Sequence, residues 1–439
     1  MQSNFKTKKS KLLLGVIFSL IMIGVFVIGL REFRIYNNKY LSQTHSYTIS
    51  AGNWDDFNKS QIDKLIASYG NSSPTYNSNR RPYVIFDWDN TAVFRDVEEA
   101  TLIYQLENLR FAMTPDEMNK ALRHEIPLSN FSDDFNNSDG KSLNIDLVVP
   151  DIIESYRWLY TNYIGLKGNL SLEEVKKNSN YLNFITKVRY LYSAIGGTFD
   201  VSVSYPWVLY LFTGMDESGV RQMVKETLAW QIQQPVESVK WTSPDSLPGN
   251  SGVVSVTWKN GLRLIPEMQN LFETFRVAGF DIWICTASFV DVIKEVSSNS
   301  EYGYNNPPER VIGMELERDI SGKIMTKFRE GYIQTQGKGK TEAIERFIVP
   351  KYGYGPIFIA GDSEGDMNMM QDFSETKLVL IINRLKGKDI ATFSKLAYES
   401  YGKPEAKFLL QGRNENTGEF VKSQANVSGN ESTVLLPIN

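Results

Sequence analysis

The fold is decided by the stretch YVIFDWDNT at residues 83–91, in which a short apolar run ends in two carboxylates. The apolar run is typical of a strand buried in a parallel sheet. Ligands of open α/β sheets bind beyond the carboxyl ends of the strands, so Asp87 and Asp89 are expected at a binding edge. There, a first carboxylate can act as a nucleophile and a second as a general acid or base. Two aspartates after a strand are also a common solvated turn, so the interpretation depends on the rest of the chain.

Strand and helix patterns alternate in the second half of the chain. Helices are predicted at 266–279, 289–298 and 340–349, and strands at 281–287, 356–362 and 377–384. This alternation indicates a doubly wound parallel sheet, a Rossmann-like α/β core with helices on both faces.

A long insertion interrupts this core after its first strand. The predicted core comprises residues 81–96 and 263–412, and a mostly helical region at 97–262 separates its two parts. Residues 41–80 are polar and are predicted to be a linker. Residues 413–439 are predicted to be a polar, largely irregular C-terminal tail, with VLLP as a candidate docking strand. The sequence therefore predicts one α/β domain that is split by a second domain.

Three further elements place polar side chains at the same edge of the predicted sheet. Thr286 ends a strand, where its hydroxyl and neighbouring backbone N–H groups can hold a phosphate oxygen. Lys340 opens a helix and can neutralise that phosphate. The segment GDSEGD at 361–366 follows a strand, and Asp362 with Asp87 would offer the oxygen ligands that Mg²⁺ prefers. Four such elements in chain order favour phosphoryl chemistry over a solvated turn.

The four elements, DWDNT, Thr286, Lys340 and GDSEGD, resemble the motifs of the haloacid dehalogenase (HAD) superfamily. The resemblance covers residues 83–96 and 263–390, and the insertion at 97–262 has the location of a cap domain of the first class. It implies phosphoester hydrolysis, because phosphatases of this group carry an acid where this chain has Asp89. Transport ATPases have a threonine there, and dehalogenases lack the acid.

The resemblance also implies a covalent mechanism. Asp87 would attack phosphorus to give an aspartyl-phosphate, and Asp89 would protonate the leaving alcohol and then activate water. Thr286 and Lys340 would hold the phosphoryl group. The ligands of Mg²⁺ would be Asp87, Asp89 through its main-chain carbonyl, Asp362 and, in support, Asp366.

Four segments, at 95–108, 199–214, 301–313 and 380–387, are similar to bacterial exported phosphorylcholine phosphatases. This narrower resemblance implies small substrates such as phosphorylcholine and phosphorylethanolamine. A quaternary ammonium group is bound by aromatic faces and nearby carboxylates. The candidate substrate residues are Trp88, Glu98, Glu99, Asp200, Tyr205 and Trp207. The alternative is structural, with the aromatic residues in a core and the glutamates as the acidic first turn of a helix.

Two other functions stay open at this point. One is a HAD phosphatase for phosphoserine or another small phosphate ester. The other is a catalytically silent binding protein that keeps the fold, although Asp87 and the other motif residues are all present. A glycosidase with paired aspartates is less favoured, because Thr286 and Lys340 would have no role in it.

The composition excludes several other classes. The chain has 439 residues, of which 42% are hydrophobic and 22% charged, as in globular proteins. Its one cysteine, Cys285, rules out an internal disulfide framework and a cysteine-based metal cluster. With only His45 and His124, a histidine-rich zinc site is improbable.

The N-terminal segment predicts a membrane anchor. Residues 12–30 carry no charge and would span about 28 Å as a helix, close to the thickness of the bilayer core. Four lysines between residues 6 and 11 form the positive flank expected on the cytoplasmic side. We therefore expect an extracytoplasmic catalytic domain anchored to a bacterial cell membrane. The alternative is a cleaved signal peptide and a secreted or periplasmic protein.

The net charge argues against nucleic acid as a partner. Residues 1–40 hold seven Lys/Arg and one acid, so the remainder has 40 basic and 50 acidic residues. Residues 41–439 therefore carry a net charge of about −10, and a negatively charged domain does not attract a polyanion. The expected partners are a small phosphate ester and, through residues 12–30, the membrane; the sequence gives no sign of a protein partner.

Overall fold

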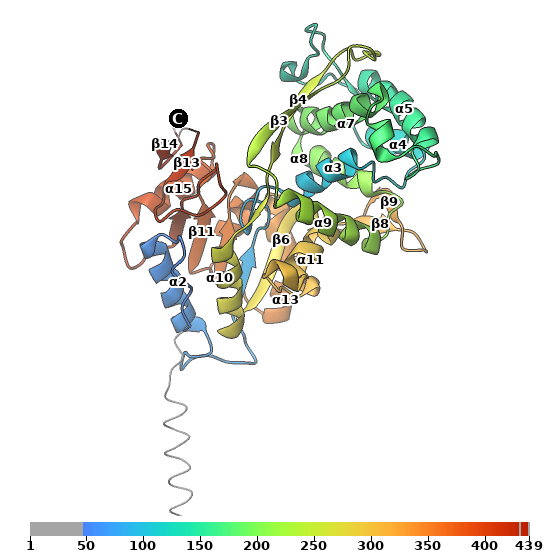
Figure 1. Cartoon of the computed structure of the whole chain (residues 1–439). Helices are drawn as coiled ribbons and strands as arrows, with labels where there is room; N and C mark the ends of the chain where they lie inside the picture. Colours follow the sequence, from blue (N-terminus) through green and yellow to red (C-terminus); the bar gives the residue numbers. More distant parts are fainter. Residues whose placement is uncertain (1–46, 430–431, 438–439) are drawn as a thin grey trace, which may run out of the picture. The chain divides into compact units, whose positions relative to one another are not determined.

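A six-stranded parallel sheet forms the centre of the structure, a computed structural model that describes residues 47–429 and 432–437 (Figure 1). The strands follow the order β12-β11-β10-β1-β6-β7. Their bounds are β1 Tyr83–Phe86, β6 Asp281–Phe289, β7 Val311–Met314, β10 Phe358–Gly361, β11 Leu378–Ile382 and β12 Phe408–Gln411. The predicted α/β class is confirmed, and the edge strands β7 and β12 are additions to the predicted set.

Helices cover both faces of the sheet because successive residues of a strand point to opposite sides. On one face, Tyr83 and Ile85 of β1 belong to a buried cluster with side chains of α12, α14 and α15. On the other face, Phe86 packs on Phe272 of α10, with ring centroids 4.4 Å apart. The helices of the core are α2 Asp56–Tyr69, α10 Pro266–Val277, α11 Val290–Ser298, α12 Lys338–Phe347, α13 Val349–Tyr352, α14 Met367–Asp372 and α15 Ile390–Glu399.

The strand order brings the predicted motifs together. β1 pairs with β6 on one side and with β10 on the other, all in parallel. The carboxyl ends of β1 and β10 therefore lie beside β6, with Asp87 and Asp362 directly after their strands. The prediction that Thr286 ends a strand is wrong, because β6 continues to Phe289, and Thr286 lies two residues beyond the last β6 residue that pairs with β1, Ile284.

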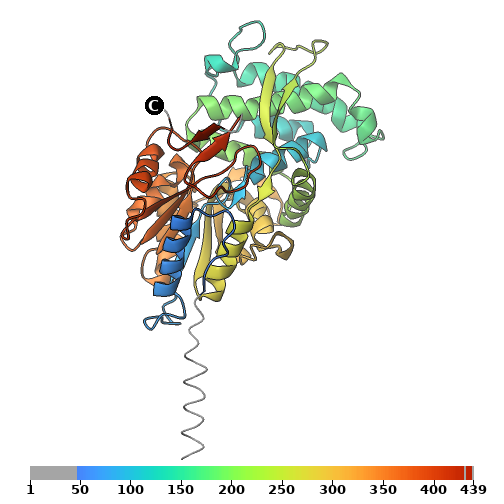
Figure 2. The ribbon, with the colours of Figure 1, turned by 60° about the vertical axis from the view of Figure 1, so that its left-hand side comes forward.

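The insertion at 97–262 forms a mostly helical cap beyond the carboxyl ends of the strands, as both views show (Figures 1 and 2). Its helices are α3 Val97–Glu107, α4 Pro115–Arg123, α5 Ile145–Asn162, α6 Leu172–Val175, α7 Ser179–Thr198, α8 Val201–Leu209 and α9 Glu217–Gln231. It also contains the hairpin of β3 (Glu237–Thr242) and β4 (Ser255–Asn260). The chain leaves and re-enters the core through two paired strands, β2 (Val93–Phe94) and β5 (Arg263–Leu264). A core hairpin of β8 (Leu316–Arg318) and β9 (Ile324–Phe328) meets the cap where the Gly214 amide donates to the Ile324 carbonyl.

The prediction of a linker at 41–80 is wrong for α2. Asp55 caps this helix, and Ile62 and Ile66 are fully buried. The Asn58 amide side chain donates to the carbonyl of Leu410 in β12, at 2.8 Å. The helix is thus part of the core, because its apolar stripe covers the sheet near an edge strand.

The prediction of an irregular C-terminal tail is also wrong. Strands β13 (Asn426–Ser428) and β14 (Ser432–Val434) form a hairpin, and Arg413 is fully buried. Phe420 packs on Trp54, with ring centroids 5.1 Å apart. This segment therefore docks on the core despite its polar composition.

The predicted membrane helix at 12–30 lies outside the described residues. Within the described part of the chain, no helix has both the length and the apolar character needed to cross a bilayer.

Candidate active site

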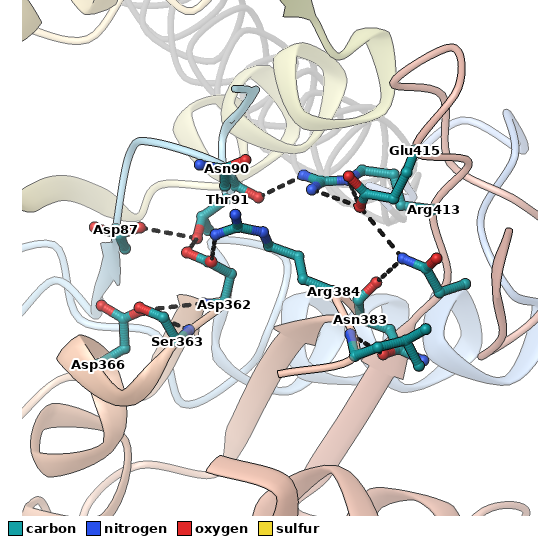
Figure 3. Close-up of polar contacts among 12 residues, drawn as sticks. Asp87, Asn90, Thr91, Asp362, Ser363, Asp366, Asn383, Arg384, Arg413 and Glu415 are labelled. Atoms are coloured by element: carbon teal, nitrogen blue, oxygen red, sulfur yellow. Dashed lines mark hydrogen bonds and ion pairs between the residues drawn. The ribbon is translucent and has the colours of Figure 1, made fainter. Parts of the chain in front are cut away.

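Asp87 sits at the end of β1 between a cation and a hydroxyl. Lys340, in the first turn of α12, places its Nζ 2.5 Å from Asp87 Oδ1 and 2.7 Å from Asp366 Oδ1. The Thr91 hydroxyl donates to Asp87 Oδ2 at 2.9 Å and contacts Asp362 Oδ1 at 3.1 Å. All of these side chains are buried. The geometry fixes the Asp87 carboxylate at the edge of the sheet, as Figure 3 shows for its contact with Thr91.

Asp89 is held by the start of the cap and by the end of β6. Its Oδ1 accepts from the amide of Val97 at 2.7 Å, and its Oδ2 accepts from the hydroxyl of Ser288 at 2.6 Å. Burial raises the pKa of Asp89 well above its usual range, and the nearby carboxylate of Asp96 adds to this shift. In the metal-free protein, Asp89 is therefore poised to carry a proton near neutral pH.

A cluster of three buried acids, Asp87, Asp362 and Asp366, can hold a metal ion. One oxygen from each lies within 4.8 Å of the others. The neighbouring cations are Lys340 and Arg384, which pairs with Asp362. When all three carboxylates are ionised, two cations leave one negative charge uncompensated. Oxygen donors with this charge excess suit a hard divalent cation such as Mg²⁺.

The pKa values of these groups follow from burial and from their neighbours. Burial raises the pKa of Asp87 to about 8, with a further contribution from Asp366, while Lys340 opposes the shift. Burial alone would raise the pKa of Asp362, but Arg384 holds it below its ordinary value. Burial would lower the pKa of Lys340, but Asp366 and Asp87 raise it well above its usual range. Lys340 is thus a fixed positive charge beside the nucleophile position.

A cavity of about 480 Å³ opens over these groups. Its floor comes from the core and includes Asp87, Thr286 and Lys340, while Val201 and Tyr205 of α8 contribute from the cap. The volume suits a small ligand rather than a macromolecule.

Comparison with known proteins identifies a curated relative of this chain. No family profile matches the chain. Phosphorylcholine phosphatase from Pseudomonas aeruginosa is 23% identical over 336 residues, which cover 70% of this chain and 76% of that protein. The chain is a phosphatase that is similar to enzymes of the HAD superfamily.

Two solved structures extend the comparison of this phosphatase. A conserved protein of unknown function from Anaerococcus prevotii is 33% identical, with a TM-score of 0.83, over 88% of this chain and 100% of that chain. The two proteins therefore belong to one family. A phosphoserine phosphatase structure, titled as a phospho-aspartyl intermediate analogue, is 12% identical with a TM-score of 0.30, over 69% of this chain and 87% of that chain. That similarity is too low to carry an argument.

The motif residues predicted from the sequence meet around the cavity of the phosphatase. Those that line it are Asp87, Asp89, Thr286, Lys340 and Asp362. Asp366 lies just behind them, where its Oδ2 accepts from the amides of Asp362 and Ser363 at 3.0 and 3.1 Å. This position agrees with a supporting role for Asp366.

The aromatic residues predicted to bind substrate divide into two groups. Tyr205 lines the cavity and is 41% exposed. Trp207 is 1% exposed and donates its indole N–H to the carbonyl of Leu122 at 2.9 Å. Trp88 is fully buried against Tyr304, with ring centroids 4.8 Å apart. The prediction fails for both tryptophans, because they pack in the core and the cap.

The acidic residues predicted to bind substrate are engaged elsewhere. Glu98 accepts from the amide of Phe289 at 2.8 Å, and Glu99 pairs with Arg189. Asp200 is exposed and caps α8 by accepting from the amide of Ser202. These three carboxylates serve helix ends and ion pairs, so their predicted substrate role is not supported.

Several polar residues at the site were missed by the sequence reasoning. Asp96, Ser288, Arg384 and Lys386 line the cavity. Arg384 and Lys386 fall in the segment 380–387, which resembles phosphorylcholine phosphatases, so a signal was present for them. Asp96 falls in the segment 95–108, which carries the same resemblance, whereas Ser288 lies in an ordinary strand and carried no signal of its own.

Proposed function

We propose that the phosphatase hydrolyses small phosphomonoesters through an aspartyl-phosphate on Asp87. The observation that carries the proposal is the buried contact of 2.5 Å between Asp87 Oδ1 and Lys340 Nζ at the floor of the cavity. A carboxylate fixed by a cation beneath a small cavity is suited to attack a phosphorus atom in line. Lys340 and Thr286 would then offset the negative charge that accumulates on the phosphoryl oxygens.

Asp89 would transfer the protons of this reaction. Its raised pKa makes it a proton donor to the leaving alcohol near neutral pH. After the alcohol departs, the same carboxylate can accept a proton from the water that attacks the aspartyl-phosphate. The contact with Ser288 at 2.6 Å keeps Asp89 oriented through both steps.

We propose Mg²⁺ as the cofactor, bound by Asp87, Asp362 and the carbonyl of Asp89, with support from Asp366. The three clustered carboxylates supply the oxygen donors and the excess negative charge that such an ion requires. When bound, the ion would provide electrostatic stabilisation of the phosphoryl oxygens.

Phosphorylcholine and phosphorylethanolamine are the substrates that we propose first. The curated relative from P. aeruginosa is named for phosphorylcholine, and the cavity offers the half-exposed ring of Tyr205 and the carboxylate of Asp96. An aromatic face and an acid are the groups that bind a quaternary ammonium.

A second candidate is an ester with another anionic group, such as phosphoserine. Arg384 and Lys386 both line the cavity in addition to Lys340. Because Lys340 faces the phosphoryl position and Arg384 pairs with Asp362, Lys386 is the cation that we propose for a carboxylate on the substrate.

Phosphate release by the full chain from a panel of esters tests both candidates. The panel contains phosphorylcholine, phosphorylethanolamine, phosphoserine, glycerol phosphate and p-nitrophenyl phosphate, each with Mg²⁺ or EDTA. The variant Asp87→Asn should be inactive on every ester. Lys386→Met should weaken only the use of phosphoserine, and Lys388→Met, an exposed neighbour outside the cavity lining, is its matched control. A preference for phosphoserine would reject the choline site, and activity in EDTA would reject the metal.

We also propose that residues 12–30 anchor the phosphatase to the membrane with its catalytic domain outside the cytoplasm. The uncharged run and the lysines before it support this proposal. The protein should sediment with membranes and resist extraction at alkaline pH. A mature N-terminus after residue 30, found by mass spectrometry, would instead show a cleaved signal peptide.

A further inference from the structure

The C-terminal segment, defined as residues 413–428, contacts the active site in a way that the HAD mechanism does not require. Arg413 is fully buried, and its Nη1 donates to the carbonyl of Asn90 at 2.8 Å. Its Nε and Nη2 donate to Glu415 Oε1 at 2.9 and 2.8 Å. Figure 3 shows Arg413 lying between Asn90 and Glu415. The guanidinium therefore ties this segment to the loop that carries Asp87 and Asp89.

Asn90 is a sensitive point in that loop. It follows Asp89 directly and has a φ of +62°, a left-handed conformation that costs free energy in a residue other than glycine. Its carbonyl belongs to the peptide that leads into Thr91, whose hydroxyl contacts both Asp87 and Asp362. By holding this peptide, Arg413 fixes Thr91 and, through it, the orientation of Asp87.

The same segment holds the loop on the other side of Asp362. The Asn426 side-chain amide donates to the carbonyl of Asn383 at 2.7 Å and also contacts Glu415 at 3.2 Å. Asn383 precedes Arg384, which pairs with Asp362. Figure 3 shows the Asp362 carboxylate in contact with both Thr91 and Arg384. The C-terminal segment thus contacts both loops whose side chains, Thr91 and Arg384, contact Asp362.

The C-terminal segment also packs closely against the side chain of Phe94 in β2. The Arg413 guanidinium lies 4.8 Å from the centroid of the Phe94 ring. Gly418, in the turn of the C-terminal segment, has a φ of +86°, and a Cβ added there would lie 2.6 Å from Phe94 Cδ1. The turn therefore packs closely against β2, the strand that follows the Asp87–Thr91 loop.

We propose that Arg413 is a positioning residue for catalysis, through which the C-terminal segment is linked to the catalytic loop. Burying a guanidinium is costly unless it is paired and hydrogen-bonded, and here its donors are divided between Glu415 and one carbonyl of the catalytic loop. Arg413 acts through Asn90 and Thr91 and does not itself touch the reacting atoms.

The test compares the full chain with Arg413→Met/Glu415→Gln and Arg413→Lys. The double variant removes both charges together, so neither is left buried without its partner. A lysine keeps the positive charge but lacks the planar guanidinium that donates to Asn90 and Glu415 at the same time. The control is Phe420→Leu, which loosens the packing of the same segment on Trp54 without removing a contact to the loop.

We expect kcat on p-nitrophenyl phosphate to fall about 100-fold in the double variant, with KM within about threefold, because misplacement of a reacting group impairs chemistry more than binding. Arg413→Lys should fall between the double variant and the unaltered protein. Phe420→Leu should lower the melting temperature but keep kcat within about twofold, since its change lies away from the loop.

Hydrogen–deuterium exchange gives a second readout that does not depend on activity. Peptides covering residues 87–97 and 383–389 should exchange faster in the double variant than in Phe420→Leu. The inference is overturned if the folded double variant keeps kcat within about threefold, if Phe420→Leu loses as much, or if exchange at 87–97 is unchanged. An inactive unaltered protein would refute the proposed function alone, because the exchange comparison would still decide the role of Arg413.

Discussion

The protonation of Asp87 should control the affinity for a divalent cation. In the metal-free protein the pKa of Asp87 is raised to about 8 by burial and by Asp366. A carboxyl must lose its proton before it binds Mg²⁺, so binding should release one proton below that pH. With a pKa of about 8, about 1% of Asp87 is ionised at pH 6 and about half at pH 8. The association constant should therefore be about 50-fold weaker at pH 6 than at pH 8.

Isothermal titration of the full chain with Mg²⁺ between pH 6 and 9 measures this dependence. Repeating the titration in buffers of different ionisation enthalpy counts the protons released. Asp87→Asn should lose the slope, because an amide does not titrate. Asp89→Asn should keep it, because Asp89 is expected to bind the ion through its main-chain carbonyl. An affinity that stays constant from pH 6 to 8, or a slope that persists in Asp87→Asn, would refute the reasoning.

Three further predictions concern the cap. Tyr205→Ala should raise KM for phosphorylcholine while changing stability by less than about 0.5 kcal/mol, because Tyr205 is half-exposed at the cavity; denaturant unfolding and initial rates check this. Trp207→Ala should instead lower the free energy of unfolding by about 3–5 kcal/mol, since it empties a buried site, and an unchanged midpoint would contradict the packing role. Burial would raise the pKa of Asp151, but hydrogen bonds from Ser251, Asn250 and Lys187 lower it. The stability that Asp151 contributes is therefore present above pH about 4 and is lost as the pH falls through its lowered pKa. Thermal melts at pH 3 and pH 6 check this, and the difference in melting temperature between the two pH values should be smaller in Asp151→Asn.

The catalytic side of the site could be predicted from the sequence because its residues are placed by the sheet. Asp87 and Asp362 each follow an apolar strand, Thr286 lies in β6 just beyond its pairing with β1, and parallel strands bring their carboxyl ends to one edge. A shared edge alone does not make these residues neighbours, because adjacent strands are about 4.8 Å apart. The order of β1 between β6 and β10 brings them together, and the sequence did not predict that order.

The supporting residues could not be predicted in the same way. Arg413 lies in a polar segment, and its significance comes from one contact with the carbonyl of Asn90, more than 300 positions earlier in the chain. Asn90 lies in the DWDNT motif, but nothing in the sequence around Arg413 connects it to that motif. The helix α2 was missed for a different reason, because its apolar positions are few and its first residues look like a linker, although Asp55 is a recognisable N-cap.

The substrate side of the site shows where helical geometry could have improved the prediction. Tyr205 and Trp207 are two residues apart on α8, so their side chains point about 200° apart around the helix. Only one of them can face the cavity while the other faces the interior of the cap, and the structure places Tyr205 at the cavity and Trp207 inside. Glu98 and Glu99, one residue apart on α3, are likewise directed to different partners, Phe289 and Arg189. Spacing alone could have reduced Tyr205 and Trp207 to one candidate. The choice between them, and the loss of both glutamates, depend on how the cap packs on the core, and that information lies in contacts distant in the sequence.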